Sequence, residues 1–363
     1  AELLKSCDTA EEVQDLKADH AQWWKDYWSA SYIKLDTTDP QLDTMMKYYY
    51  GAQYILGSSA REGELAPGIM GIWCTTDSPM WNGHYQLNYN YNAPVYGAGS
   101  SNRPELNLPI FEQILEYEDI GRANSESVEQ LMRLETDGSG RGHGYVTKLI
   151  NEGKIDPEKG IEGGLFYPVG ITPWGQSTCP TLFHNETLCA AYSAFPAIDY
   201  WQYTMDNDYL KDYLYDYLKG CATFYETWLE KDENGQYNMY AGYHENSWGY
   251  TPAVELTTVW YLFDTIVDAS ETLGVDEDKR ELWIDIRDNL ASQPTAEYNG
   301  KTVYALAEKS WNGSGYVDMA SPVPADGNAI PLESIGQCNR FGYFSTPEEL
   351  EIARNTIDVF DGT

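Results

Sequence analysis

The sequence has few basic residues for its size. It carries 23 Lys and Arg against 57 Asp and Glu, which gives a formal net charge of -34 at pH 7 and a pI near 4.2. Nucleic-acid binding depends on Lys and Arg that displace counterions from phosphates, so this chain would repel a polyanion. The composition therefore excludes nucleic acid as a partner and disfavours acidic substrates for the same reason.

Long hydrophobic runs are also missing. No segment approaches the roughly 20 apolar residues that a membrane-spanning helix needs, and the N-terminus lacks a basic segment followed by a hydrophobic one. We therefore expect no membrane span and no uncleaved signal peptide. The acidic balance and the many Trp and Tyr residues suit an exported protein, secreted, periplasmic or at the cell surface, whose signal peptide has been removed. Because the chain starts at Ala1 without Met and stops at Thr363, we expect it to continue in a longer polypeptide.

Cysteine pairs with metal-ligand spacing are absent. The six cysteines show neither a CxxC pattern nor a nearby histidine at zinc-site spacing, so no metal site is expected. Buried free thiols are the simplest interpretation, and disulfides remain open for Cys7, Cys74, Cys179, Cys189, Cys221 and Cys338.

Aromatic residues, by contrast, are abundant: 14% of the chain, with 30 Tyr and 12 Trp. This composition predicts a packed core. Apolar residues that recur every three or four positions predict helices, and Asn299-Gly300 predicts the turn of a short β-hairpin over 297–306. Gly274 is typical of a helix end, and Thr346 with Glu349 is typical of a capping box. The predicted helices cover 42–50, 109–115, 208–229, 256–273, 276–290 and 346–357.

Strands and helices do not alternate along the chain, which disfavours a Rossmann fold or a TIM barrel. The length suits one large helical domain over residues 1–363. Three long segments without periodicity are rich in Gly, Asn, Pro and Trp, and such segments in a compact domain are usually functional loops. They cover 57–107, 136–182 and 236–252.

The stretch from Gly71 to Asn92 mixes aromatic rings with amides. A site for neutral sugars needs flat rings against the apolar face of the sugar and amides for its hydroxyls. The alternative is an Asn-rich loop whose amides satisfy its own turns. On the first interpretation, the candidate substrate contacts are Trp73, Trp81, His84 and Tyr85.

A second segment, 243–249, places a single carboxyl between an imidazole and an indole. Apolar and aromatic neighbours disfavour an ionised carboxylate, so we expect a raised pKa for Glu245, as a proton donor requires. His244 and Trp248 are further candidate substrate contacts. The alternative is that Glu245 only caps its loop.

Longer matches accompany both segments. Residues 54–67, followed by Gly71-Ile72-Trp73 and Leu87-Asn88-Tyr89-Asn90, and residues 198–210, followed by His244-Glu245-Asn246, have an order and spacing similar to those of one enzyme family. The chain resembles family 95 of the glycoside hydrolases, the α-L-fucosidases and α-L-galactosidases, over most of its length.

The resemblance implies an all-α fold, an (α/α)6 toroid of helical hairpins with long active-site loops, incomplete at its C-terminal end. It implies an inverting exo-glycosidase without metal or cofactor that hydrolyses a terminal α-L-fucosyl or α-L-galactosyl residue of an oligosaccharide or glycan. Glu245 would protonate the glycosidic oxygen. Asn88 and Asn90 would hold the attacking water for an aspartate base expected beyond residue 363.

The chain departs from the family pattern at three places, and one of them is Asn92-Ala93-Pro94, which differs from the Met-Asn-Tyr-Trp that usually follows the Asn pair. Asp326 lies in a segment similar to that of the family's base, but it precedes the 346–357 helix, so we interpret it as a turn residue. The family's His-Arg-His sugar-binding motif is not found between Tyr316 and Arg340. The sugar therefore stays open, as do two alternatives: another toroidal enzyme, such as a glucosidase, phosphorylase or lyase, and a non-catalytic carbohydrate-binding relative.

Overall fold

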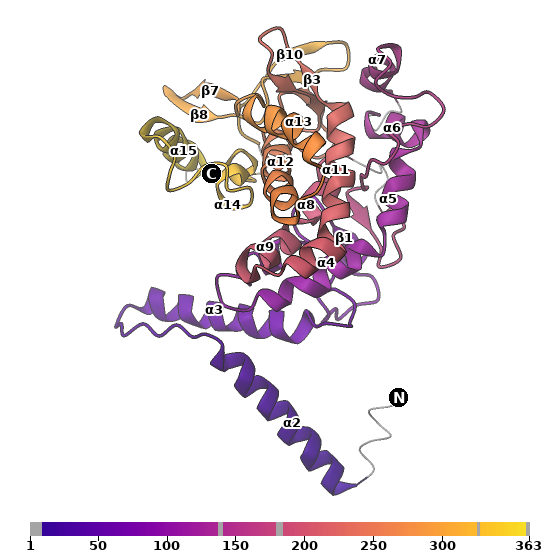
Figure 1. Cartoon of the computed structure of the whole chain (residues 1–363). Helices are drawn as coiled ribbons and strands as arrows, with labels where there is room; N and C mark the ends of the chain where they lie inside the picture. The colour runs from indigo at the N-terminus through magenta and orange to yellow at the C-terminus, as the bar shows by residue number, and fades with distance from the viewer. Residues whose placement is uncertain (1–8, 137–140, 179–183, 325–326, 361–363) are drawn as a thin grey trace.

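A computed structural model describes residues 9–136, 141–178, 184–324 and 327–360. These residues are mainly helical with a few short strands, as Figure 1 shows. The larger helices are α2 (Ala10–Ser29), α3 (Pro40–Ser59), α4 (Leu108–Leu115), α5 (Glu118–Ser125), α6 (Val128–Leu134), α7 (Tyr145–Asn151), α9 (Phe195–Thr204), α11 (Tyr215–Trp228), α12 (Ala253–Leu273), α13 (Glu277–Asp288) and α15 (Pro347–Phe360).

Shorter helical segments connect them. They are η1 (Met80–Gly83), η2 (Ala93–Val95), η3 (Pro104–Asn107), α8 (Cys189–Ser193), α10 (Asn207–Tyr209), the π-helical η4 (Leu210–Leu214), η5 (Ile330–Leu332) and α14 (Glu333–Gly336).

The strands are all short and antiparallel within the described residues. One sheet has the order β10-β9-β6-β5, and three further pairs are β1-β2, β3-β4 and β7-β8. Their bounds are β1 (Tyr85–Gln86), β2 (Gly170–Ile171), β3 (Glu230–Lys231), β4 (Tyr237–Asn238), β5 (Tyr240–Ala241), β6 (Gly249–Tyr250), β7 (Thr295–Tyr298), β8 (Lys301–Tyr304), β9 (Lys309–Trp311) and β10 (Tyr316–Asp318).

The core lies around α12, which packs on α11 and α13. Most of α12 is buried, because apolar residues occupy nearly its whole circumference rather than one stripe. Its other neighbours are α8, α14 and η5. Helix α12 is therefore the central helix against which the neighbouring helices pack.

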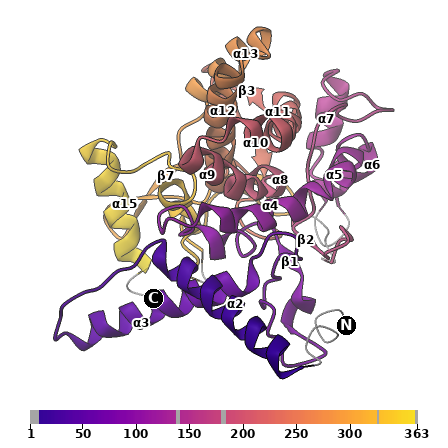
Figure 2. The same cartoon turned by 60° about the horizontal axis from the view of Figure 1, so that its bottom comes forward.

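The helix α2 extends away from the rest of the described chain in Figure 1, and Figure 2 shows it from below. It docks through its last turn, where Tyr27 is buried and donates to the Gln53 carbonyl at 2.6 Å. The buried Arg103 guanidinium donates to the Tyr27 carbonyl at 3.0 Å and lies 4.4 Å from the Tyr27 ring centroid. Gly57 is required here, since a Cβ would lie 2.7 Å from the Tyr27 ring.

The predicted helix end, capping box and hairpin turn are confirmed. Gly274 ends α12 with φ of 66°, and the Thr346 hydroxyl accepts the Glu349 N–H at 3.2 Å while Glu349 accepts back from Thr346. Asn299 and Gly300 have φ of 52° and 77°, as a two-residue hairpin turn between β7 and β8 needs. The sequence analysis did not predict the four-stranded sheet, since its strands of two or three residues are too short to show a period.

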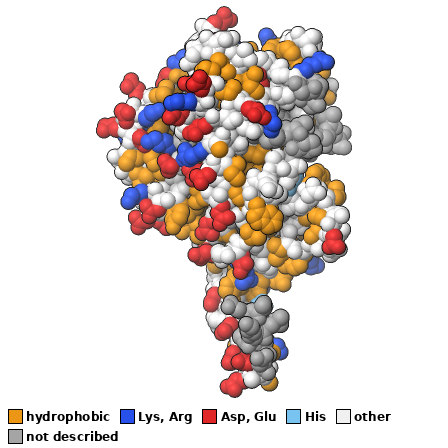
Figure 3. Space-filling model, turned by 90° about the vertical axis from the view of Figure 1, so that its right-hand side faces the viewer, with side chains coloured by type: hydrophobic (Ala, Val, Ile, Leu, Met, Phe, Trp, Pro, Cys, Tyr) orange, Lys and Arg blue, Asp and Glu red, His pale blue; other side chains and the backbone are white. Residues whose placement is uncertain are grey.

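Among the described cysteines, Cys189, Cys221 and Cys338 are buried, as expected, and the last two are free thiols. Cys74 is also free but exposed, so the expectation of burial is wrong there, because it lies in a surface loop. Asp and Glu side chains are spread over the face drawn in Figure 3. In the described part of the chain, no helix combines the length and apolar character that spanning a membrane requires.

Candidate functional site

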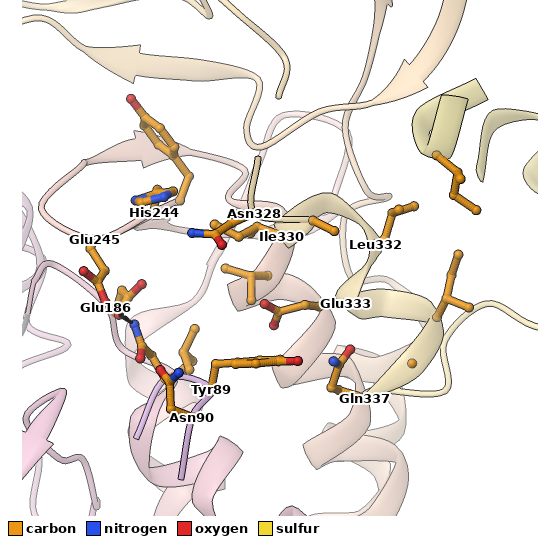
Figure 4. A pocket seen from close by; sticks show the side chains of 18 residues that line it. Tyr89, Asn90, Glu186, His244, Glu245, Asn328, Ile330, Leu332, Glu333 and Gln337 are labelled. Atoms are coloured by element: carbon orange, nitrogen blue, oxygen red, sulfur yellow. Dashed lines mark hydrogen bonds between the residues drawn. The ribbon is translucent and has the colours of Figure 1, made fainter. Parts of the chain in front are cut away.

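A cavity of about 600 Å³ opens where four loop segments meet. Figure 4 shows side chains from all four pointing toward it. The lining residues follow β1 (Asn88, Tyr89, Asn90), precede or begin helices (Glu186, Leu188, Val254), form the β5–β6 loop (Tyr243, His244, Glu245) and belong to the C-terminal part (Asn328, Ala329, Ile330, Leu332, Glu333, Ile335, Gly336, Gln337, Ile357).

The β1–β2 pair places Asn88 at the cavity. Gln86 pairs with Gly170, and the Leu87 N–H donates to the Val169 carbonyl at 2.7 Å. The chain then turns sharply, as the Tyr91 N–H bonds the Gln86 carbonyl at 2.9 Å. Leu87 is buried in the core, so the alternation along the strand directs its two neighbours, Gln86 and Asn88, to the other side.

The β5–β6 loop is positioned by two backbone hydrogen bonds to the segment before α8. The Gly242 N–H donates to the Asn185 carbonyl at 2.7 Å, and the Asn246 N–H donates to the His184 carbonyl at 2.9 Å. Gly249, which starts β6, has no room for a side chain, because a Cβ would lie 2.4 Å from the Lys309 carbonyl oxygen. These contacts bring Glu245 beside residues 184–186.

The side chains form one hydrogen-bond network. Asn88 Nδ2 donates to Glu245 Oε1 and to Glu186 Oε2, at 3.0 Å each. Gln86 Nε2 donates to the same Glu245 Oε1 at 2.9 Å and to Asn88 Oδ1 at 3.0 Å. His184 Nδ1 lies 3.6 Å from the other carboxylate oxygen of Glu245, Oε2. Each Glu245 oxygen therefore faces at least one donor or cation.

This environment overturns the predicted pKa direction for Glu245. The His184 ring is the main cause that lowers the pKa of Glu245 to about 2, and the hydrogen bond from Asn88 acts in the same direction against the effect of burial. The apolar neighbours that the sequence suggests are not the closest ones, since amides and an imidazole surround the carboxyl. Glu245 is thus a carboxylate at neutral pH.

The neighbouring carboxyl of Glu186 behaves in the opposite way. It is buried, and burial together with the charges of Glu255 and Glu245 raises its pKa well above the usual range. Glu255 of α12 is also buried, and burial raises its pKa to about 7. Its Oε1 accepts the Thr187 N–H at 2.6 Å, which fixes the backbone next to Glu186. The site therefore holds one ionised carboxyl, Glu245, and one that favours the neutral form, Glu186, with the raised-pKa carboxyl of Glu255 buried nearby.

Of the predicted site residues, Asn88, Asn90, His244 and Glu245 lie together at the cavity. The other five do not line it. Trp73 and Trp81 are 55% and 57% exposed on surface loops, whereas His84, Tyr85 and Trp248 are buried.

Tyr85 and Trp248 have partners away from the cavity, whereas His84 interacts with Gln86 and Glu245 as well as with Thr178. His84 Nδ1 lies 2.6 Å from the Thr178 hydroxyl, and the Tyr85 hydroxyl donates to the Ala66 carbonyl at 2.9 Å. The Trp248 indole stacks on His143 with 4.7 Å between ring centroids. The aromatic-rich composition that suggested sugar contacts is thus largely used for packing at these positions.

Several residues of the hydrogen-bond network and of the cavity wall are not distinguished by the sequence as site residues. Glu186 lies in the glycosylation-type triplet Asn185-Glu186-Thr187, which indicates no catalytic role, and His184 stands outside any recognisable motif. Gln86 and Tyr89 lie within the 71–92 stretch. The cavity wall from Asn328 to Gln337 lies between Tyr316 and Arg340, where the sequence has no recognisable His-Arg-His motif. Asp326 lies outside the described residues. Among the residues with described structure, no three His, Cys, Asp or Glu side chains are grouped to hold a metal ion.

Comparison with known proteins identifies the family. The sequence matches the glycosyl hydrolase family 95 catalytic domain over residues 11–302, which is most of the chain. The chain belongs to glycosyl hydrolase family 95. Three of the four cavity segments, those around Asn88, Glu186 and Glu245, fall within the family 95 match, and the wall from Asn328 to Gln337 falls outside it.

Curated relatives support the same family. The chain is 24% identical over 289 residues to "Alpha-L-fucosidase 2" of Arabidopsis thaliana, covering 76% of this chain and 28% of that protein. It is 24% identical over 249 residues to "Probable alpha-fucosidase A" of Aspergillus niger, covering 66% of this chain and again 28% of the relative. The chain thus spans just over a quarter of the length of these family 95 relatives.

Among solved structures, the chain is similar to one titled "Putative kojibiose phosphorylase from human microbiome". The identity is 12%, the TM-score is 0.45, and the similarity covers 67% of this chain and 33% of that one.

Proposed function

We propose that this chain is the catalytic region of an inverting exo-glycosidase that hydrolyses a terminal α-L-fucosyl or α-L-galactosyl residue of an oligosaccharide or glycan. The observation that carries the proposal is the contact of Glu245 with Asn88 at the mouth of one cavity, in a member of family 95. The names of the curated relatives support the fucosyl substrate. A single helical domain of (α/α)6 type and export from the cell are part of the same proposal.

In the proposed reaction, Glu245 protonates the glycosidic oxygen of the leaving group. Gln86 and Asn88 hold its Oε1, which leaves the Oε2 edge near His184 to deliver the proton. A carboxyl with so low a pKa is protonated only in a small fraction of molecules at neutral pH, so the acid step favours acidic pH. Substrate binding that expels water from the 40% exposed Glu245 side chain would raise its pKa toward a useful value.

Asn88 and Asn90 orient the water in this scheme. Both N–H groups of Asn88 are taken by Glu186 and Glu245, so Asn88 acts on a water through its Oδ1, which accepts a single hydrogen bond from Gln86. Asn90 is exposed and lines the cavity, so its amide can face the same water. Inversion further requires a base about 6.5 to 9.5 Å from the acid, with the water between them.

The second candidate is a carbohydrate-binding relative without hydrolytic activity. It is favoured by the ionised state of Glu245, because a site whose proposed general acid carries no proton binds sugars without cleaving them.

Both candidates are tested with the full-length protein. A panel of aryl glycosides and oligosaccharides with terminal fucose, galactose or glucose is incubated with the enzyme, and the anomer of the first product is followed by NMR. The proposal expects release of fucose or galactose with inverted configuration. Retained configuration would exclude inversion, glucose release would change the sugar, and binding by calorimetry without hydrolysis would support the second candidate.

A further inference from the structure

The C-terminal wall of the cavity contains a carboxyl that the proposed reaction does not use. Glu333 begins α14 and lines the cavity, and Figure 4 shows its side chain pointing inward near Asn328 and Tyr89, with Glu245 on the far side. Its backbone carbonyl accepts the N–H groups of Gln337 and Cys338 at 3.1 and 3.3 Å. The position of Glu333 is therefore set by the local helix and not by its own carboxyl.

The Glu333 carboxyl lacks the partners that a buried anion needs. Its Oε2 is shielded from solvent and has no hydrogen-bond partner in the described part of the chain. The titratable groups that interact electrostatically with Glu333 are Tyr96, Tyr192 and Cys338. Burial raises the pKa of each of these groups above its ordinary value. They stay neutral near pH 7, so no cation faces Glu333 from these elements, and burial raises its own pKa to about 8.

Apolar side chains make up much of the wall around Glu333. The same wall carries Ile330, Leu332 and Ile335, and Val254 and Leu188 face the cavity from the helical side. A neutral carboxylic acid has one O–H to donate and a carbonyl oxygen to accept. In an apolar pocket, this donor and this acceptor are suited to one sugar hydroxyl. A sugar that lacks the hydroxyl at that position leaves the buried acid without a hydrogen bond, and this cost makes the site discriminate strongly against such a sugar.

We infer that Glu333 is a specificity-determining residue that, as the neutral acid, exchanges a hydrogen bond with one hydroxyl of the terminal neutral sugar. The inference rests on the proposed function for the location of the sugar. The cavity wall that contains Glu333 lies outside the family 95 match at residues 11–302. This wall can therefore differ from that of relatives and set the sugar preference of this chain. A uronic acid is disfavoured, since its carboxylate would share the cavity with the ionised carboxylate of Glu245.

The test measures binding, not turnover. Calorimetry with the full-length protein uses free L-fucose, L-galactose, D-glucose and D-glucuronic acid, at about pH 6 and about pH 10, two units on either side of the Glu333 pKa. The variants are Glu333→Gln, which keeps a neutral donor and acceptor, and Glu333→Leu, which removes both. The matched control is Glu281→Gln, an exposed position on α13.

The wild type and the control are expected to bind the neutral sugar about ten-fold more weakly at the higher pH, because the ionised acid loses its donor. Glu333→Gln is expected to lose this additional pH dependence and to retain most of the affinity, and Glu333→Leu to bind about ten-fold more weakly at both pH values. The titratable groups outside position 333 are the same in the wild type and the Glu333 variants, so their pH effects cancel in the comparison.

The inference is overturned if Glu333→Leu binds as the wild type does, or if Glu333→Gln shows the full pH-dependent loss. Binding of glucose in place of fucose or galactose, with the variant pattern intact, would contradict the proposed substrate and leave the role of Glu333 standing. A wild-type protein that binds none of the neutral sugars would contradict both.

Discussion

Asn88 Nδ2 and Glu245 Oε1 lie 3.0 Å apart although 157 positions separate them in the chain. The same nitrogen reaches Glu186 at 3.0 Å, so a single amide joins an ionised carboxyl to one that favours the neutral form. Burial raises the pKa of Glu186, whereas His184 lowers the pKa of Glu245. This arrangement leads to the predictions that follow.

Glu245→Gln is expected to reduce kcat by about two to four orders of magnitude in the full-length enzyme, as loss of a general acid does. The substitution keeps the size of the side chain but removes its proton-carrying group. Initial rates on an aryl fucoside or galactoside measure the effect, and Glu281→Gln on the exposed face of α13 is the control. A rate close to that of the wild type would remove Glu245 from the mechanism.

His184→Leu is expected to shift the pH dependence of kcat/KM toward higher pH. The His184 ring is the largest cause of the low Glu245 pKa, so its removal raises that pKa and increases the protonated fraction of Glu245. Each unit of increase gives about ten-fold more acid at neutral pH.

The alkaline limb of the kcat/KM profile measures this shift, and the exposed His20 of α2, replaced by Leu, is the control. An alkaline limb at the same pH in wild type and His184→Leu would show that His184 does not tune the acid.

The stability of the fold is expected to fall as pH rises from about 4.5 to about 8. Glu255 and Glu333 have folded-state pKa values of about 7 and about 8, above the unfolded value of about 4.3. Between these values the folded state holds more protons than the unfolded state, so the free energy of unfolding decreases by up to about 1.4 kcal/mol per pH unit for each group. Carboxyls with lowered pKa, such as Glu245, act below about pH 4.3 and do not offset this loss.

Thermal unfolding across this pH range checks that prediction. Glu255→Gln, which keeps the polar contact to Thr187 without titrating, is expected to flatten the slope. A Tm that rises steadily from pH 5 to pH 8 would contradict the neutral state of these buried carboxyls.

Arg103→Ala is expected to release α2 from the rest of the chain. The guanidinium is buried and donates to the Tyr27 carbonyl, to the Ser101 carbonyl at 2.8 Å and to the Ser31 hydroxyl at 2.6 Å. Losing it removes these three hydrogen bonds, with a local cost of about 2 to 4 kcal/mol. Hydrogen exchange should accelerate in α2 and stay unchanged in α12, whereas the exposed Arg354→Ala should alter neither. Unchanged protection of α2 would refute this attachment.

The sequence contained enough information to predict most of the long helices and their ends. Gly274, the Thr346–Glu349 capping box and the Asn299-Gly300 turn act through local backbone geometry, which neighbouring residues determine. By contrast, α2 was missed although Thr9 and Glu12 form a capping box, because its apolar stripe is weak and most of the helix is exposed. The two-residue strands near Glu245 could not be predicted from periodicity, because two residues are too few to show a repeat.

The site was predictable in part. The segments with Asn88, Asn90 and Glu245 were found from their mixture of residue types and their order along the chain, and family membership follows from the same residues. Trp73, Trp81, Tyr85 and Trp248 could not be separated from true cavity residues, because an aromatic side chain serves packing and sugar contact equally well in a sequence.

What the sequence determined by itself is therefore local and chemical: acidity, helices with their caps, one hairpin, a family, and the residue types of two loops. Only the tertiary structure decided which carboxyls are ionised, that His184 and Glu186 flank the Asn88–Glu245 pair, and that Glu333 faces them. The physical reason is that a pKa depends on solvent exclusion and on charges within a few ångströms, and those neighbours come from segments that are distant in the chain.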